Sequence, residues 1–365
     1  MTAPIPFARR PLRIVHVGSF PTRIKGAFIH GAAQKFSNGL TRLGHYVVNF
    51  GDREHARAAS VVGFRQLGIA QTNKALIRLC REVMPDVFLL GHADLIAPET
   101  VAAVRDVVPG VRMVQWNNDG MFDAGNVARL KARIGLFDVT FIAAAGPEAA
   151  PLLGLGAPVA YLPNPVDPSV ERGRAFLRDD LGSDLLCPVG KGGEVRYHCG
   201  HARTPEDLIG RIRRDIPGLR CAIPGMFGQP YVLGHRYQAL LEDARMGLNL
   251  SKHNDHHLYS SDRLAHLMGN GVLAFVDRAT GLDRFFADDE VAFYATEDEL
   301  VATLQALHGD DARRRRMAGN GWRTCHALFG ERRLAGYMLA AAYGEPVAGR
   351  YPWPTVLPEA APCSR

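Results

Sequence analysis

The sequence predicts an α/β protein made of two Rossmann-like domains, each built on a parallel sheet. Three observations lead to this prediction. The chain has 365 residues, of which 47% are hydrophobic and 22% are charged, which is enough apolar material for two cores. Short apolar runs alternate with amphipathic segments of helical period, as in sheets whose parallel strands are joined by helices. A proline-rich stretch near residue 163 interrupts the alternation, which then starts again.

The first half of the chain begins with a predicted strand at Arg13 to Gly18. Apolar residues at helical spacing follow this strand, and Gly44 ends the helix that they indicate. The further strands that we expect in this half are 46–50, 86–90, 111–115, 138–142 and 158–162. Helical stretches between several of them predict a doubly wound sheet.

A domain boundary is expected at the segment PNPVDPSV, which has three prolines in eight residues. Neither a helix nor a central strand tolerates so many prolines. We therefore expect a first domain at 1–165, a linker at 166–178, a second domain at 179–345 and an irregular tail at 346–365.

The second domain repeats the alternation of strands and helices. Its expected strands are 195–199, 219–223, 246–250, 272–276 and 291–294. Thr204 precedes Pro205, and Thr296 lies three residues before Glu299. Both patterns mark helix starts, because a threonine hydroxyl can cap the first free N–H groups.

Composition narrows the class of protein. No apolar run approaches the ~20 residues that cross a bilayer, and no signal peptide is recognised, so a cytoplasmic protein is expected. The six cysteines are scattered without a C-x2-C pair, which disfavours a zinc module or a disulfide framework. The net charge of +6 is dispersed without a nucleic-acid motif. Phosphate-bearing ligands and an anionic membrane surface both stay open.

Four loops follow predicted strands, where ligands collect in such sheets. The first runs from Gly18 to Gly31 and lacks the G-x-G-x-x-G spacing of dinucleotide sites. Its Arg23, Lys25 and His30 could meet an acceptor, or the loop could be an ordinary surface loop. The sequence leaves both interpretations open.

The second and third loops carry polar side chains directly after a strand. His92 lies in the second loop, and the third reads QWNNDG. In this loop Trp116 offers a stacking face, Asn117 and Asn118 offer amide donors, and Asp119 offers a carboxylate. Capping of a helix by His92 and bracing of Asn117 by Asp119 are the structural alternatives.

The fourth loop leads to a predicted helix start at Ser260, Ser261 and Asp262, whose free N–H groups suit a diphosphate. Arg263 adds a positive charge there. The preceding loop 252–257 concentrates histidines but lacks a paired ligand motif. We therefore prefer a hydrated loop and expect no metal.

The segments LNLS, YSSDR and MGNGVLAFVDR resemble the CgeB-like branch of the GT-B glycosyltransferases. The resemblance extends, more weakly, to QWNNDG and to IAAAGPEAAPLLGLGAPVAYLPNPVD. It implies a GT-B fold of two Rossmann-like domains facing a cleft, with the donor on the C-terminal domain and the acceptor on the N-terminal domain. It also implies no essential metal and no cofactor besides the nucleotide-sugar substrate. Carried over by position, the donor-binding residues are Gly200, Arg203, Gly225, Tyr259, Ser260, Ser261, Arg263 and His266.

One departure from that family concerns stereochemistry. Many retaining GT-B enzymes carry an E-x7-E pattern, whose positions are taken here by Leu258 and His266. An inverting reaction would need a base on the N-terminal domain, for which Asp119, His92 and His30 are the candidates. In a retaining reaction the leaving phosphate could guide the acceptor proton.

The function expected from this reading is sugar transfer from a nucleoside diphosphate donor to a hydroxyl of a glycan or lipid-linked acceptor. Bacterial surface polysaccharide or lipopolysaccharide assembly is the expected setting, with peripheral contact with the inner membrane left open and no nucleic-acid partner. Two alternatives remain. A nucleotide-sugar epimerase would bind the same donor without an acceptor, and a non-catalytic protein would bind the nucleotide without turnover.

Overall fold

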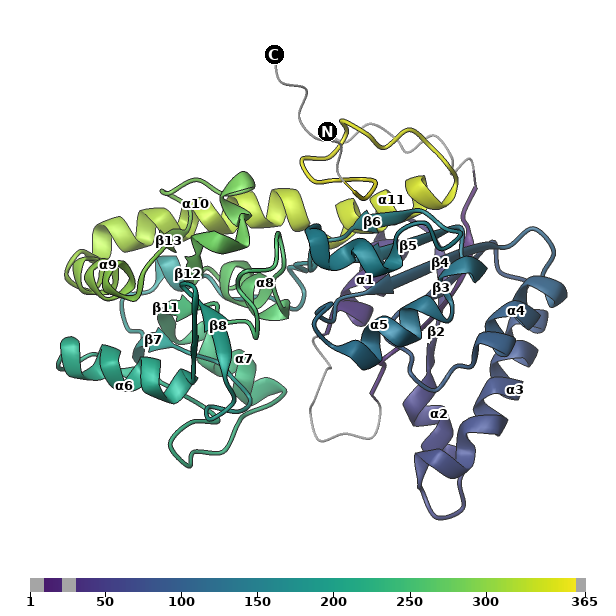
Figure 1. The fold of residues 1–365 in the computed structure, drawn as a ribbon, viewed down its shortest axis with the longest axis horizontal. Helices are drawn as coiled ribbons and strands as arrows, with labels where there is room; N and C mark the ends of the chain where they lie inside the picture. The colour runs from purple at the N-terminus through teal and green to yellow at the C-terminus, as the bar shows by residue number, and fades with distance from the viewer. Residues whose placement is uncertain (1–9, 22–30, 359–365) are drawn as a thin grey trace. The chain divides into compact units, whose positions relative to one another are not determined.

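The computed structural model describes residues 10–21 and 31–358 of the chain. Contacts divide the chain into two units. Unit 1 comprises residues 1–163 and 331–365, and unit 2 comprises residues 164–330. Each unit is an α/β layer structure built on a parallel sheet (Figure 1). Among the described residues, no helix is both long and apolar enough to cross a membrane.

The described part of unit 1 contains a six-stranded parallel sheet in the order β2-β1-β3-β4-β5-β6. Its strands are β1 (Arg13–Gly18), β2 (Tyr46–Gly51), β3 (Val87–Leu90), β4 (Arg112–Asn117), β5 (Val139–Ile142) and β6 (Val159–Tyr161). The six strands predicted for the first half are therefore confirmed. The strand order reverses between β1 and β3, which places a topological switch point, where ligands bind in such sheets, at their carboxyl ends.

Helices cover both faces of this sheet. They are α1 (Ala32–Arg42), α2 (Asp52–Ala58), α3 (Arg65–Val83), α4 (Pro98–Val107), α5 (Ala124–Lys131) and α11 (Glu331–Ala342), with short turns η1 (Ile134–Leu136) and η2 (Pro147–Leu152). Leu76 of α3 and Val104 of α4 share one core with Val17 and Leu90 of the sheet. Helix α1 packs instead against α11 (Figure 1). The alternation of strands and helices thus buries both faces, as the periodicity predicted.

The C-terminal helix α11 belongs to unit 1, whereas the sequence-based boundary assigned residues up to 345 to the second domain. It packs so closely on α1 that a Cβ at Gly39 would lie 2.3 Å from the Glu331 carbonyl oxygen. Arg42 also donates to Glu331 at 2.6 Å. The expected tail continues along β6, because the Leu357 N–H donates to the Val159 carbonyl at 2.8 Å. Helix α11 is buried along most of its length, and no local pattern in its sequence shows which unit buries it.

Unit 2 contains, within its described residues, a five-stranded parallel sheet in the order β10-β7-β11-β12-β13. Its strands are β7 (Ser183–Leu186), β10 (Cys221–Ala222), β11 (Ala244–Leu248), β12 (Leu273–Asp277) and β13 (Ala292–Tyr294). Four of the five strands predicted for this half are confirmed. The segment predicted at 195–199 is not part of the sheet, since β8 (Arg196–His198) pairs antiparallel with β9 (His201–Arg203).

The strand that the sequence analysis missed is β7. Its polar Asp184 interrupts the apolar run, but the carboxylate is buried against Arg220, whose side chain donates to it at 2.7 and 2.9 Å. A buried carboxylate, paired with a half-exposed arginine, thus occupies a position where periodicity expects an apolar residue.

The helices of unit 2 are α6 (Pro205–Asp215), α7 (His235–Glu242), α8 (Asp262–Gly269), α9 (Glu297–Gly309) and α10 (Asp311–Phe329), with turns η3 (Ala175–Leu177), η4 (Arg278–Thr280) and η5 (Leu282–Arg284). Two of these helices, α6 and α9, begin where the capping threonines predicted. Thr204 accepts from the Asp207 N–H, and Thr296 accepts from the Glu299 N–H. The arginine run at the start of α10 is not a wholly solvated face, because Arg314 is buried and bonded to Asp311.

Candidate functional site

The carboxyl edge of the unit 1 sheet brings together two of the residues predicted for catalysis. His92 follows β3 and Asp119 follows β4, so the two loops emerge side by side from adjacent parallel strands. The Nδ1 atom of His92 lies 2.8 Å from Asp119 Oδ2. Strand ends alone predicted that both residues lie at this edge, and the structure shows that they contact each other.

The protonation of His92 follows from its second neighbour. Arg53, the second residue of α2, places Nη2 3.1 Å from His92 Nε2. A guanidinium can only donate, so Nε2 accepts and Nδ1 carries the proton that is donated to Asp119. Arg53 also donates to both oxygens of Asp94, at 2.9 and 3.0 Å. His92 therefore has no free lone pair with which to act as a base unless Arg53 moves.

Asp119 is the more accessible of the two groups, since 43% of its side chain is exposed. Burial raises the pKa of its carboxyl, but the hydrogen bond from His92 and the charges of Arg129 and Arg53 outweigh this effect and leave the pKa below its ordinary value. The group is therefore a carboxylate at neutral pH. It can accept a hydrogen bond from a hydroxyl ligand.

The neighbours of Asp119 in its loop serve mainly to hold its shape. The buried side chain of Asn117 exchanges two hydrogen bonds with Asn126, at 2.9 and 3.0 Å. Its Oδ1 atom also accepts from the Asp119 N–H at 3.0 Å. Asn117 thus braces the backbone of Asp119, and Asn118 beside it is half-buried.

Trp116 does not offer the stacking face that the sequence suggested. Its side chain is buried, and Nε1 donates to His16 Nε2 at 3.0 Å. A Cβ at Gly91 would lie 2.4 Å from the Trp116 ring, so the ring fills the core at the end of β3. The predicted Arg23, Lys25 and His30 lie outside the described residues.

The carboxyl edge of the unit 2 sheet carries Arg263, in the first turn of α8. Its Nε donates to the Pro188 carbonyl after β7, and Nη1 donates to the Leu250 carbonyl after β11, both at 2.9 Å. Nη1 also lies 2.9 Å from Ser261 Oγ. Arg196, at the start of β8, donates to the same Leu250 carbonyl at 3.0 Å. Two guanidinium groups therefore converge on one backbone oxygen.

Within the described part of the chain, neither guanidinium contacts a carboxylate. Arg196 is only 6% exposed, and its Nε has no hydrogen-bond partner among these residues. Burial, followed by the nearby charge of Arg263, lowers the pKa of Arg196 to about 10, so the group is still charged at neutral pH. A buried and a half-buried cation side by side without a counterion are costly unless an anion binds beside them. Sequence analysis missed Arg196 because it lies on the hairpin that was assigned to the sheet.

The other residues predicted on α8 and its loop lie close to this pair. The Ser261 N–H donates to Ser251 Oγ at 3.3 Å, and the Ser260 carbonyl accepts from Asn164 at 2.8 Å. Tyr259 is buried immediately before them. These contacts fix the start of α8, whose first N–H groups have no partner within the helix.

His266 lies one turn further into α8 and is buried. Its Nδ1 lies 2.9 Å from Oε1 of Glu171, a buried residue of the segment between the two sheets in sequence. The second oxygen of Glu171 accepts from the Asp167 N–H at 2.8 Å. A carboxylate thus lies beside the helix position where the resembling family has a glutamate, although it comes from another part of the chain.

Gly225, Gly200 and Arg203 have different surroundings. Gly225 has φ +81°, and a Cβ there would lie 2.5 Å from the Val189 carbonyl oxygen, so glycine allows the loop after β10 to approach the loop after β7. Gly200 lies in the exposed turn between β8 and β9. Arg203 forms an ion pair with Glu297. Gly225 therefore lies at the edge that carries Arg263, whereas Gly200 and Arg203 belong to the hairpin.

Comparison with known proteins agrees with this architecture. Residues 203–340 match a family model described as glycosyl transferase-like. Sucrose-phosphate synthase from Thermosynechococcus elongatus is similar in structure, with TM-score 0.60, 10% sequence identity and coverage of 91% of this chain and 98% of that chain. HepE from Anabaena, solved with UDP and glucose, gives TM-score 0.57, 10% identity and coverage of 91% and 100%. The protein has the GT-B fold.

A third solved structure is also similar over nearly the whole chain. AviGT4, a glycosyltransferase involved in avilamycin A biosynthesis, gives TM-score 0.55 at 16% identity, with coverage of 91% of this chain and 97% of that chain. No curated protein matches the chain by sequence. The fold predicted from the sequence is confirmed, and at such identities the structural likeness concerns the fold alone.

Proposed function

We propose that this protein is a glycosyltransferase whose nucleotide-sugar donor binds to unit 2 through Arg196 and Arg263. The observation that carries the proposal is the pair of guanidinium groups that meet at the Leu250 carbonyl without a carboxylate partner among the described residues. The glycosyl transferase-like match over residues 203–340 supports it. So does HepE, a GT-B protein solved in complex with UDP-glucose.

Sugar transfer from a nucleoside diphosphate requires positive charge near the diphosphate, where Arg196 and Arg263 would lie. The bond between the anomeric carbon and the diphosphate oxygen breaks, the acceptor oxygen bonds to that carbon, and the diphosphate leaves with added negative charge. Arg196, Arg263 and the N-terminal N–H groups of α8 would stabilise that charge in a partly dehydrated site. Guanidinium groups suit this role because they form paired hydrogen bonds with phosphate oxygens.

On the acceptor side we propose Asp119 as the group that receives the hydrogen bond of the acceptor hydroxyl. Its carboxylate is ionised and partly exposed, and Asn117 and His92 hold it in place. In an inverting reaction this carboxylate would take the proton. In a retaining reaction it would position the hydroxyl while the leaving phosphate takes the proton.

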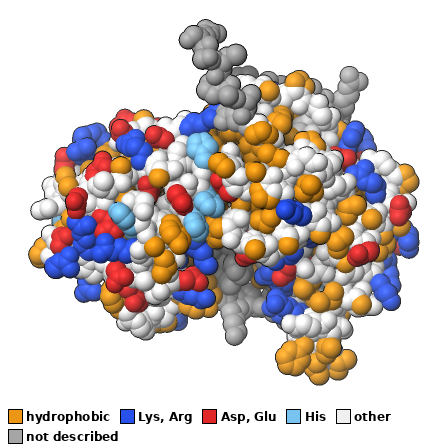
Figure 2. Space-filling view, viewed as in Figure 1, with side chains coloured by type: hydrophobic (Ala, Val, Ile, Leu, Met, Phe, Trp, Pro, Cys, Tyr) orange, Lys and Arg blue, Asp and Glu red, His pale blue; other side chains and the backbone are white. Residues whose placement is uncertain are grey.

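A lipid-linked acceptor is favoured by an apolar tip on unit 1. Val61, Val62, Phe64 and Leu67 lie at the turn between α2 and α3, with exposed fractions between 64% and 105%. Figure 2 shows hydrophobic side chains gathered at this turn. Arg57 and Arg65 lie beside the tip in sequence, so apolar and basic groups are combined as in segments that bind anionic bilayers. We propose an anionic lipid surface, such as the bacterial inner membrane, as its partner.

Calorimetry with UDP-, GDP-, ADP- and CMP-sugars tests the donor site. We expect one donor class to bind and Arg196→Gln to weaken it by at least about tenfold, because a charge-assisted contact to phosphate is lost. Arg214→Gln is the matched control, since Arg214 is exposed in unit 2 and paired with Asp215. Absence of binding by every donor, or equal loss in both variants, would overturn the proposal.

Incubation with donor alone separates transfer from the alternatives. An epimerised sugar released without an acceptor would favour an epimerase. Binding without either product, in the presence of lipid-linked and glycan acceptors, would favour a non-catalytic nucleotide-binding protein.

A further inference from the structure

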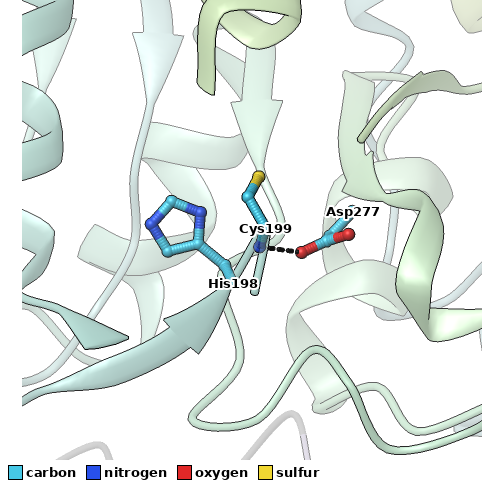
Figure 3. A group of neighbouring side chains, drawn as sticks. All are labelled: His198, Cys199 and Asp277. Atoms are coloured by element: carbon cyan, nitrogen blue, oxygen red, sulfur yellow. Dashed lines mark hydrogen bonds between the residues drawn. The ribbon is translucent and has the colours of Figure 1, made fainter. Parts of the chain in front are cut away.

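A second group of chemically distinctive side chains lies beneath the hairpin β8–β9 in unit 2. His198 is the last residue of β8, Cys199 begins the turn, and Asp277 ends β12 of the sheet. One possible ligand atom from each of the three lies within 4.8 Å of the others. Figure 3 shows the Cys199 thiol and one ring nitrogen of His198 on the same side of the hairpin.

The surroundings of His198 lack the hydrogen bonds that a buried imidazole requires. The residue is 2% exposed, and neither ring nitrogen has a hydrogen-bond partner within residues 10–21 and 31–358. The Tyr294 hydroxyl and Glu297 Oε1 are buried nearby and equally unsatisfied in that part of the chain. Buried polar atoms without partners are rare and usually indicate an ion or water at the site.

We propose that His198, Cys199 and Asp277 bind a zinc ion. An imidazole nitrogen, a thiolate sulfur and a carboxylate oxygen are the ligand types that Zn²⁺ takes in proteins. On binding, the Cys199 thiol releases its proton to solvent as the zinc–sulfur bond forms.

A carboxylate lies near one ring nitrogen of His198 without forming a hydrogen bond to it. This nitrogen, Nε2, lies 3.5 Å from Glu297 Oε1, so Nδ1 is the atom left to face the ion. A carboxylate on the second nitrogen commonly orients a zinc-bound histidine. Asp277 is fixed as well, since its oxygens accept from the Cys199 and Ala279 N–H groups at 2.6 and 2.9 Å. Each of these oxygens keeps a further lone pair for the ion.

The ion would anchor the hairpin to the sheet. Arg196 begins the same strand that His198 ends, so a zinc ion would also help to hold Arg196 over the Leu250 carbonyl. Only this last link rests on the proposed function. The ligands come from positions 198, 199 and 277, and the long interval between them explains why spacing in the sequence predicted no metal.

Equilibrium dialysis of the full chain against Zn²⁺, after removal of metal with a chelator, tests the proposal. We expect about one zinc per chain in the native protein, and a loss of affinity of at least about tenfold in Cys199→Ser and His198→Gln. Cys221→Ser and the exposed His235→Ala are matched controls, because these residues lie outside the three-residue group. No zinc in the native protein, or undiminished binding by both site variants, would contradict it.

Cobalt spectroscopy gives an answer even if a site variant fails to fold. Co²⁺ bound to the native protein should show the near-ultraviolet charge-transfer band of a cobalt–thiolate bond, and iodoacetamide labelling of Cys199 should slow when the metal is present. Bound cobalt without that band would exclude Cys199 as a ligand. Because these measurements use no nucleotide, their failure is distinct from failure of the donor site.

Discussion

The carboxyl edges of the two sheets differ in how their charges are partnered. At the unit 1 edge Arg53 is paired with Asp94, and His92 is paired with Asp119. At the unit 2 edge Arg196 and Arg263 share a backbone carbonyl and have no carboxylate among the described residues. An edge whose cations are paired with carboxylates favours binding of a neutral, hydroxyl-bearing ligand. An edge with two cations that lack a carboxylate partner favours binding of a polyanion such as a diphosphate.

The largest effect that this comparison predicts is on transfer by Asp119→Asn. We expect the rate of sugar transfer to fall by a factor on the order of 10² or more, because the amide cannot take a proton and is a weaker acceptor. Donor affinity, measured by calorimetry, should hardly change, since the residue lies in unit 1. Steady-state assays of transfer against donor concentration separate the two quantities.

The exposed Asp106→Asn on α4 is the matched control, and it should transfer normally. A near-normal rate in Asp119→Asn would reduce Asp119 to a structural brace. Weakened donor binding in the same variant would contradict the proposal that the unit 1 edge binds only the acceptor and the unit 2 edge binds the donor.

A smaller effect is expected when the apolar tip of unit 1 is changed. Phe64→Ser combined with Leu67→Ser should weaken binding to vesicles of anionic lipid by about tenfold or more, because two side chains no longer leave water. Co-sedimentation measures the bound fraction. Leu177→Ser removes a comparably exposed apolar side chain from unit 2 and should leave vesicle binding unchanged. Equal binding by native protein and the double variant would exclude the tip.

Much of the fold could be predicted because strands and helices leave a periodic signal in the chain. Where a strand carries a buried carboxylate, as at Asp184, that signal fails. The return of α11 to unit 1 was not predicted either, because it depends on a close approach at Gly39 that no local pattern encodes.

The candidate sites were predicted only in part. His92 and Asp119 follow strand ends and Arg263 lies at a helix start, and these local signals were sufficient to place the three residues at the sheet edges. Arg53 and Arg196 were missed because they act through contacts with residues distant in sequence, His92 and the Leu250 carbonyl. A side chain's partner is a property of the folded chain, so the pairing of charges that distinguishes the two edges could not be read from composition.

The smallest effect at neutral pH is expected on the free energy of unfolding, from substitution of His16, which is buried in strand β1 of unit 1. Its Nε2 accepts from Trp116, so Nδ1 donates to Ser37 at 2.8 Å, and burial lowers the pKa of His16 to about 3. The unfolded chain takes up the proton near its ordinary pKa of 6.5, whereas the folded chain does not. Stability from the neutral imidazole is thus complete above pH ~6.5 and falls as the pH decreases toward about 3.

We expect His16→Gln to flatten this loss by about 1.4 kcal/mol per pH unit between roughly pH 6 and 4. Hydrogen exchange read by mass spectrometry on β1 peptides reports the unfolding free energy of unit 1, and β12 peptides report that of unit 2. The substitution should change the pH dependence of the β1 peptides only. Burial also lowers the pKa values of His45 and His198, but both residues are present in the variant, so their contribution is unchanged. The exposed His201→Gln is the control. An unchanged pH dependence in His16→Gln would mean that the imidazole is protonated in the folded chain. The buried edge of unit 1 would then also carry a cation without a counterion, and the contrast with unit 2 would fail.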